Sequence, residues 1–170
     1  EFYLALVFIH GVGATLGVGS ATFAQIFFLK FKSMLGGQLD PGSNGFFKII
    51  FAVERIGLLL LAASGMGLVF MQWPVSASGG TPPPALLAKL TIMAVLLVDA
   101  FVWQSRGSAT YLWRGLSLAS WYTVLALGVW HGVDASYGAI MFAYVGAAFA
   151  CALLLYAVSS ALNIKTGNNL

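Results

Sequence analysis

A histidine stands within an apolar run that is long enough to cross a bilayer, and its neighbours along one helical face are almost all small. The run extends from Phe2 to Phe31. Small residues let another helix or a flat ligand approach the backbone closely. An ionisable side chain at membrane depth predicts a functional site. At helical spacing this face consists of His10, Gly13, Gly17, Ser20, Ala21 and Ala24.

Two further groups that can bind a metal, Lys89 and His131, lie on the same side of the predicted membrane as His10. At ~1.5 Å per helical residue, His10 lies roughly 12 Å from that surface, Lys89 roughly 8 Å and His131 on the order of 3 Å. Imidazole is a strong ligand for haem iron, and a second axial ligand must meet it at a similar depth. These three residues therefore predict the metal ligands of a haem b site, with Gly13 and Gly17 making room for the macrocycle. The structural alternative is that Lys89 reaches the interface and His10 hydrogen-bonds across a packed helix pair.

A second layer of charge lies toward the opposite surface and consists of Glu54, Arg55 and Asp99. Because pairing lowers the cost of burying each charge, the simpler interpretation is an ion-pair network that ties the second helix to the third. The functional interpretation is a proton-relay step or a site for an anionic group, such as a propionate or a lipid phosphate. Arg55 and Arg114 are accordingly candidates for charge balance beside a cofactor.

The composition places these groups in a membrane protein. The chain has 170 residues, of which 60% are hydrophobic and 8% charged, and its mean hydropathy is +0.92. We predict an all-α fold of a single domain over residues 1–170, with no nucleic-acid partner. Its apolar runs predict five transmembrane helices, at Phe2–Phe31, Phe46–Trp73, Pro84–Gln104, Trp113–Gly132 and Ser136–Ile164. The first run lacks a basic leader and is longer than a signal peptide, so we expect it to be a retained helix.

The basic residues predict the orientation of these helices. Lysines flank the first connection, two arginines flank the third, and Lys165 lies near the C-terminus, whereas the second and fourth connections have no basic residue. Because cytoplasmic loops are enriched in Lys and Arg, the N-terminus is predicted outside and the C-terminus in the cytoplasm. We therefore expect a multi-pass protein of the bacterial inner membrane.

The fourth predicted helix has a tryptophan, Trp121, at mid-span, where this residue is unusual. Its indole N–H needs a partner if it is buried, so we expect it to serve packing or to contact a cofactor or substrate. The residues around it repeat at alternating spacings of three and four, which is typical of a helix that faces a bundle interior. That series is Arg114, Ser117, Trp121, Val124, Gly128 and His131.

Two segments together resemble small bacterial membrane proteins of the HemJ and CopD families. One is the first-helix histidine followed by small residues; the other is the run of ten residues from Ala88 to Leu97, with Lys89 near its start. In the HemJ type, a protoporphyrinogen oxidase, a first-helix histidine and a later lysine are associated with haem b. The resemblance implies the same role for His10 and Lys89. The chain differs in having Asp99 where a further histidine would be sought, and five predicted helices rather than four.

Two functions from different classes follow. The leading prediction is a haem b protein that serves electron transfer or porphyrin-related redox chemistry, with His10 as one axial ligand and Lys89 or His131 as the other. The alternative is a non-enzymatic membrane subunit or scaffold, whose small-residue faces pack against itself or a larger complex. A third and weaker option is the passage of an ion or metal past the histidines and Met66, Met71 and Met141.

Overall fold

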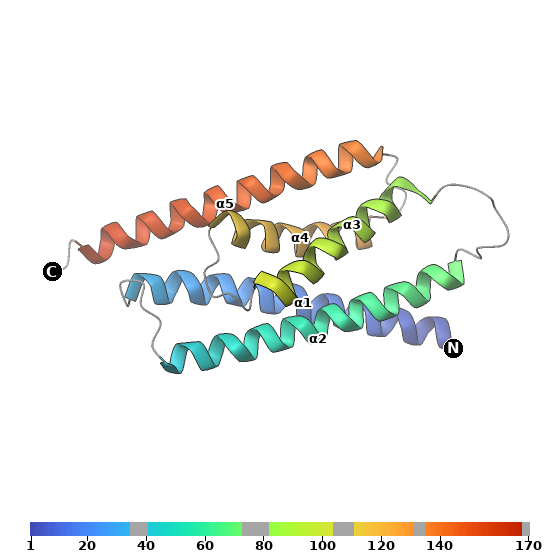
Figure 1. Cartoon of the computed structure of the whole chain (residues 1–170), viewed down its shortest axis with the longest axis horizontal. Helices are drawn as coiled ribbons and strands as arrows, with labels where there is room; N and C mark the ends of the chain where they lie inside the picture. The colour runs from blue at the N-terminus through green and yellow to red at the C-terminus, as the bar shows by residue number, and fades with distance from the viewer. Residues whose placement is uncertain (35–40, 73–81, 104–110, 131–134, 168–170) are drawn as a thin grey trace.

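A computed structural model of the chain shows five long helices packed side by side (Figure 1). It describes residues 1–34, 41–72, 82–103, 111–130 and 135–167. The helices are α1 (Phe2–Met34), α2 (Pro41–Gln72), α3 (Pro84–Val98), α4 (Tyr111–Val129) and α5 (Tyr137–Gly167). The all-helical fold predicted from the sequence is confirmed, because every regular element in these ranges is helical.

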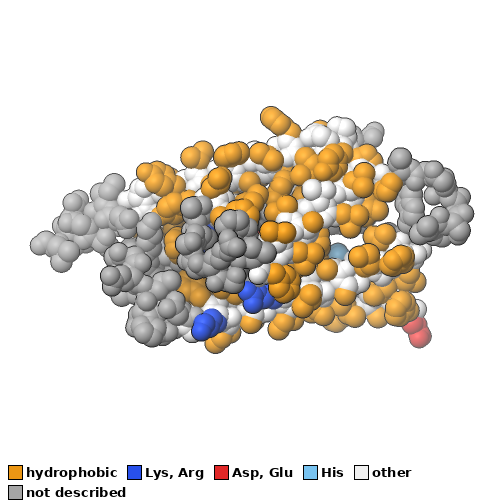
Figure 2. Space-filling view, in the orientation of Figure 1, with side chains coloured by type: hydrophobic (Ala, Val, Ile, Leu, Met, Phe, Trp, Pro, Cys, Tyr) orange, Lys and Arg blue, Asp and Glu red, His pale blue; other side chains and the backbone are white. Residues whose placement is uncertain are grey.

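Three of these helices are long and apolar enough to cross a membrane. The apolar segments are Phe2–Lys30, Pro84–Phe101 and Tyr137–Leu162. Large apolar side chains project outward from them, including Phe8 and Phe142, and orange hydrophobic side chains cover much of the face shown in Figure 2. Such a surface fits a lipid environment rather than water. The crossing of all five helices remains a prediction.

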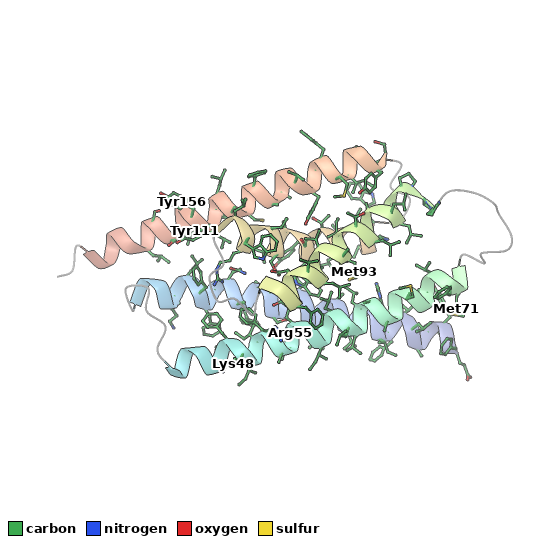
Figure 3. The ribbon with its side chains drawn as sticks, viewed as in Figure 1. Lys48, Arg55, Met71, Met93, Tyr111 and Tyr156 are labelled. Atoms are coloured by element: carbon green, nitrogen blue, oxygen red, sulfur yellow. The ribbon has the colours of Figure 1, made fainter. Side chains whose placement is uncertain are left out.

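The helices alternate in direction along the bundle, and the two termini lie at opposite ends (Figure 1). We call these the N-terminal end and the C-terminal end of the bundle. His10 and Lys89 belong to the half nearer the N-terminal end, because each lies within three turns of a helix start there. Arg55 and Arg114 belong to the other half, and Figure 3 places the labelled Arg55 and Lys48 there on α2.

The third helix changes its geometry near its end. Pro84 occupies the first turn of α3, where proline loses no intrahelical hydrogen bond. From Asp99 to Trp103 the chain continues as a π-helix, η1. A π turn is wider than an α turn and leaves backbone groups available to neighbours. One continuous helical run, Pro84–Gln104, was predicted from the sequence, and the π-helical segment within it was not.

Close backbone packing joins α1 to α2 through glycines. A Cβ placed on Gly13 would lie 2.7 Å from the backbone nitrogen of Leu61 and 2.8 Å from the carbonyl oxygen of Gly57. A Cβ on Gly57 would in turn lie 2.7 Å from the backbone nitrogen of Gly17. The two backbones are therefore in direct contact, as small residues permit in tightly packed helix pairs. We call this contact the glycine seam, formed by Gly13, Gly17 and Gly57.

One cluster of buried side chains includes residues from all five helices and from η1. It contains Ala21 from α1, Leu58 and Leu61 from α2, Ala88, Ile92 and Leu96 from α3, Ala100 from η1, Trp121, Val124 and Leu127 from α4, and Ile140 and Tyr144 from α5. Because each helix contributes to the same cluster, side chains on different helices are held in fixed relation to one another.

The glycine seam gives the first testable prediction. Replacing Gly13 with Leu forces α1 away from the α2 backbone, so we expect a loss of about 1–3 kcal/mol of unfolding free energy. Equilibrium unfolding of the detergent-solubilised protein measures this loss. Gly11→Leu is the matched control, because a side chain at Gly11 meets no atom within 4 Å. Equal stabilities for the two variants would contradict the seam.

Candidate functional site

The His10 side chain is directed toward α2 rather than toward lipid. It is half-buried, and its Nδ1 lies 3.1 Å from the hydroxyl oxygen of Ser64. Gly65 adjoins the ring, since a Cβ at that position would lie 3.2 Å from His10 Cε1. This hydrogen bond across a packed helix pair is the structural alternative given for His10 in the sequence analysis, and the role of His10 as a metal ligand stays a prediction.

The direction of the Ser64 hydroxyl determines which ring nitrogen of His10 is protonated. Ser64 is buried, and its Oγ lies 2.5 Å from the carbonyl oxygen of Leu60, which accepts its proton. The hydroxyl can then only accept a hydrogen bond from His10, so Nδ1 carries the ring proton. Nε2 consequently keeps its lone pair. A histidine that ligates iron or zinc shows this arrangement, with one nitrogen donating to the protein and the other left for the metal.

Lys89 is the second predicted ligand. It is half-buried on α3, next to Ala88 and three residues before Ile92, whose side chains are fully buried. Among the described residues no carboxylate pairs with Lys89. His10 on α1 and Lys89 on α3 are thus both half-buried in the half of the bundle nearer the N-terminal end. His131, the third, lies outside the described residues.

The predicted cradle for a macrocycle on the glycine face is already filled. The backbone of α2 covers Gly13, as described above for the glycine seam. The indole ring of Trp121 lies directly on Gly17, so that even a Cβ there would overlap its Cη2 and Cζ3 atoms. A flat ligand therefore has no room on this face. Gly13 and Gly17 serve helix packing here, which differs from the role predicted for them.

Trp121 joins three helices. Its side chain is 1% exposed, and its Nε1 donates a 2.8 Å hydrogen bond to Glu54 Oε1 on α2. The same ring packs on Gly17 of α1. The need for a partner to the buried indole N–H was predicted from the sequence, and Glu54 meets it. These contacts give Trp121 a packing role in the described part of the chain.

Asp99 and Arg55 connect the helices in a way that differs from the predicted ion-pair network. Asp99, buried at the start of η1, accepts a 2.6 Å hydrogen bond from Trp113 Nε1 at one oxygen and another from Ser117 at the other. Arg55 instead donates through Nε to the carbonyl oxygen of Ala100, at 2.9 Å. Asp99 therefore ties η1 to α4, while Arg55 ties α2 to η1 through the backbone.

Trp113 and Ser117 are the polar partners that sequence reasoning missed. They are four residues apart on α4, so they share one helical face and reach the same carboxylate. The sequence does contain a signal for this contact, namely two hydrogen-bond donors four residues apart on one helix and an aspartate on the preceding one. Its meaning depended on knowing that α3 and α4 pack together at this level.

A metal held by protein side chains alone has no support in the described segments. They contain no group of three or more His, Cys, Asp or Glu side chains that could hold an ion. Met66 and Met71, proposed for metal passage, are about half exposed on the surface of α2. A porphyrin needs fewer protein ligands, because it supplies four iron ligands itself. Two protein ligands, such as His10 and Lys89, would suffice for a haem iron but not for a metal ion held by protein side chains alone.

Comparison with known proteins adds no further constraint. The chain matches no protein-family model, no curated protein and no solved structure. The resemblance to the HemJ and CopD families therefore stays a prediction. Functional inference for this chain rests on the geometry of its own residues.

The Trp121 contact gives a second prediction. Trp121→Phe removes the indole N–H that binds the buried carboxylate, so we expect a loss of about 1–3 kcal/mol of unfolding free energy. Trp130→Phe is the control, because that side chain is 70% exposed beyond the end of α4. Denaturant unfolding followed by circular dichroism compares the two. Similar losses in both variants would mean that the Glu54 contact contributes nothing.

Proposed function

We propose that this chain is a membrane-embedded haem b protein in which His10 Nε2 is one axial ligand and Lys89 supplies the other. The observation that carries the proposal is the Ser64 hydrogen bond, which leaves Nε2 unprotonated and able to bind a metal. Desolvation favours the neutral, metal-binding form of a buried amine. A bound haem would supply one-electron redox chemistry at its iron, for electron transfer or porphyrin-related reactions.

The filled glycine seam limits where such a group fits. A ligand on Nε2 has to lie outside the seam, since α2 and the Trp121 indole occupy Gly13 and Gly17. The described residues that bear on the site are then His10, Ser64, Gly65 and Lys89. Trp121 and Arg55 belong to the packing that holds the helices, and Arg55 is committed to the backbone of Ala100.

The proposal includes a position in the membrane. All five helices would cross it, with the C-terminal end of the bundle in the cytoplasm of a bacterial cell. Support comes from the distribution of charge: Lys30, Lys48, Arg55 and Arg114 all lie in the half nearer the C-terminal end. In Figure 2 the blue side chains lie in that half, and the red of an acidic side chain appears at the N-terminal end. Positive charge favours the cytoplasmic side.

Axial ligation predicts a direct spectroscopic result. We expect the purified protein to show a Soret band when haem is added in detergent, and His10→Ala to lose it. Lys89→Ala should keep a band that is shifted or weakened, because one ligand remains. Lys30→Ala is the control, since that lysine is exposed on α1, far from His10. An unchanged spectrum in His10→Ala would remove the proposal.

The hydrogen bond to Ser64 predicts a smaller and separate effect. Ser64→Ala removes the acceptor that orients the His10 ring, and loss of such a partner lowers metal affinity by roughly 10- to 100-fold. Haem titration followed at the Soret maximum measures that affinity. Thr15→Ala is matched to it, because the Thr15 hydroxyl also donates to a carbonyl one turn earlier but binds no histidine. Equal affinities for the two variants would show that Ser64 does not position the ring.

A non-enzymatic membrane subunit remains the second candidate, and one observation favours it. Gly138 and Gly146 on α5 have no atom within 4 Å of an added Cβ, and Phe142 between them is 84% exposed. An open small-residue face of this kind permits another helix to approach. The partner would be a second copy or another membrane protein. A colourless protein that co-purifies with a stoichiometric partner would favour this function over haem binding.

A further inference from the structure

The most unusual polar group outside the His10 region is the guanidinium of Arg114. It lies one turn into α4, in the half of the bundle nearer the C-terminal end. Its Cζ lies over the Phe28 ring, 3.4 Å from the ring centroid, in a cation–π contact. Its Nε is buried and has no hydrogen-bond partner. A dehydrated N–H without an acceptor is costly, and few proteins leave one without a reason.

The remaining contacts of Arg114 leave most of its hydrogen-bonding capacity unused. Only one is present among the described residues, from Nη1 to Gln25 Oε1 at the long distance of 3.5 Å. Asp99 acts on Arg114 electrostatically, but its two oxygens accept hydrogen bonds from Trp113 and Ser117, and no ion pair joins it to Arg114 among the described residues. A guanidinium has five N–H donors in a planar fork. Arg114 therefore presents a fixed, partly exposed fork whose charge no direct ion pair neutralises.

We infer that Arg114 binds an external oxyanion, and that the ligand is a phosphate group. The planar fork matches two oxygens of one phosphate, and arginine held by an aromatic ring is pre-organised for this contact. Lys30, near the end of α1, is exposed in the same half, so its positive charge also favours an anion there. The source is either the headgroup of an anionic lipid or free phosphate.

This site is separate from the proposed haem site and does not rest on it. Gln25, which contacts Arg114, is 15 residues beyond His10 on α1. At ~1.5 Å per residue the separation along the helix is about 22 Å. A propionate of a haem ligated by His10 cannot span that distance. A failure of either proposal therefore leaves the other intact.

The test measures how anions protect the protein against heat and bind to it. Detergent-solubilised protein is titrated with phosphatidylglycerol, with phosphatidylcholine and with inorganic phosphate, in separate arms. We expect saturable protection by phosphatidylglycerol, by phosphate or by both, and none by phosphatidylcholine. Protection by the lipid alone identifies a headgroup site, and protection by phosphate identifies a free-anion site. No protection in either anionic arm overturns the inference.

Variants locate the effect at Arg114. Arg114→Gln should weaken the apparent affinity for the protecting anion at least about tenfold, because it removes a charge-assisted bidentate contact. Arg114→Lys keeps the charge but not the fork and should also bind more weakly, which covers the case in which Arg114→Gln fails to fold. Lys48→Gln is the control, since it removes an exposed charge of the same sign from α2. Unchanged affinity in the Arg114 variants, or equal losses in Lys48→Gln, contradicts the site.

Discussion

The close approach of α1 and α2 at Gly13, Gly17 and Gly57 is the constraint on which the other contacts depend. Where backbones touch, helices cannot rotate or slide without collision, so the side chains above and below the seam have fixed positions. The seam places Gly17 where the Trp121 ring can lie on it and Glu54 where the indole N–H can bind. The same register brings His10 opposite Ser64. One packing contact thus determines both the core and the candidate ligand.

The fourth helix supplies most of the polar contacts between helices. Within three turns, Arg114 contacts Gln25 of α1 and Trp121 binds Glu54 of α2. Trp113 and Ser117 both bind Asp99 of η1. Ser120 binds Tyr144 of α5. At its start the backbones of α4 and α5 also meet, since a Cβ on Gly115 would lie 2.5 Å from the nitrogen of Ala152. In a lipid environment apolar burial does little to hold helices together, so packing and interhelical hydrogen bonds carry that role.

The amino-acid sequence was sufficient to predict five helices and their approximate bounds, because apolar runs and turn residues are local signals. It also predicted that the small-residue face of α1 is a contact surface. It did not show that Gly57 and Trp121 fill that surface, since this depends on which helix packs against which. The roles of Ser64, Trp113 and Ser117 were hidden for the same reason. A serine or tryptophan in an apolar run acquires a meaning only when its partner on another helix is known.

The Ser64 hydroxyl has a consequence for the chemistry of His10. Because the Ser64 hydroxyl donates its single proton to the Leu60 carbonyl, Nδ1 of His10 carries the ring proton and Nε2 has the lone pair. A proton or a metal ion must therefore bind at Nε2. A proton and a metal ion are therefore mutually exclusive occupants of the ring. At low pH, protons would therefore compete directly with a metal ion for Nε2. The orientation of one hydroxyl thus selects Nε2, rather than Nδ1, as the ring nitrogen that can bind a proton or a metal ion.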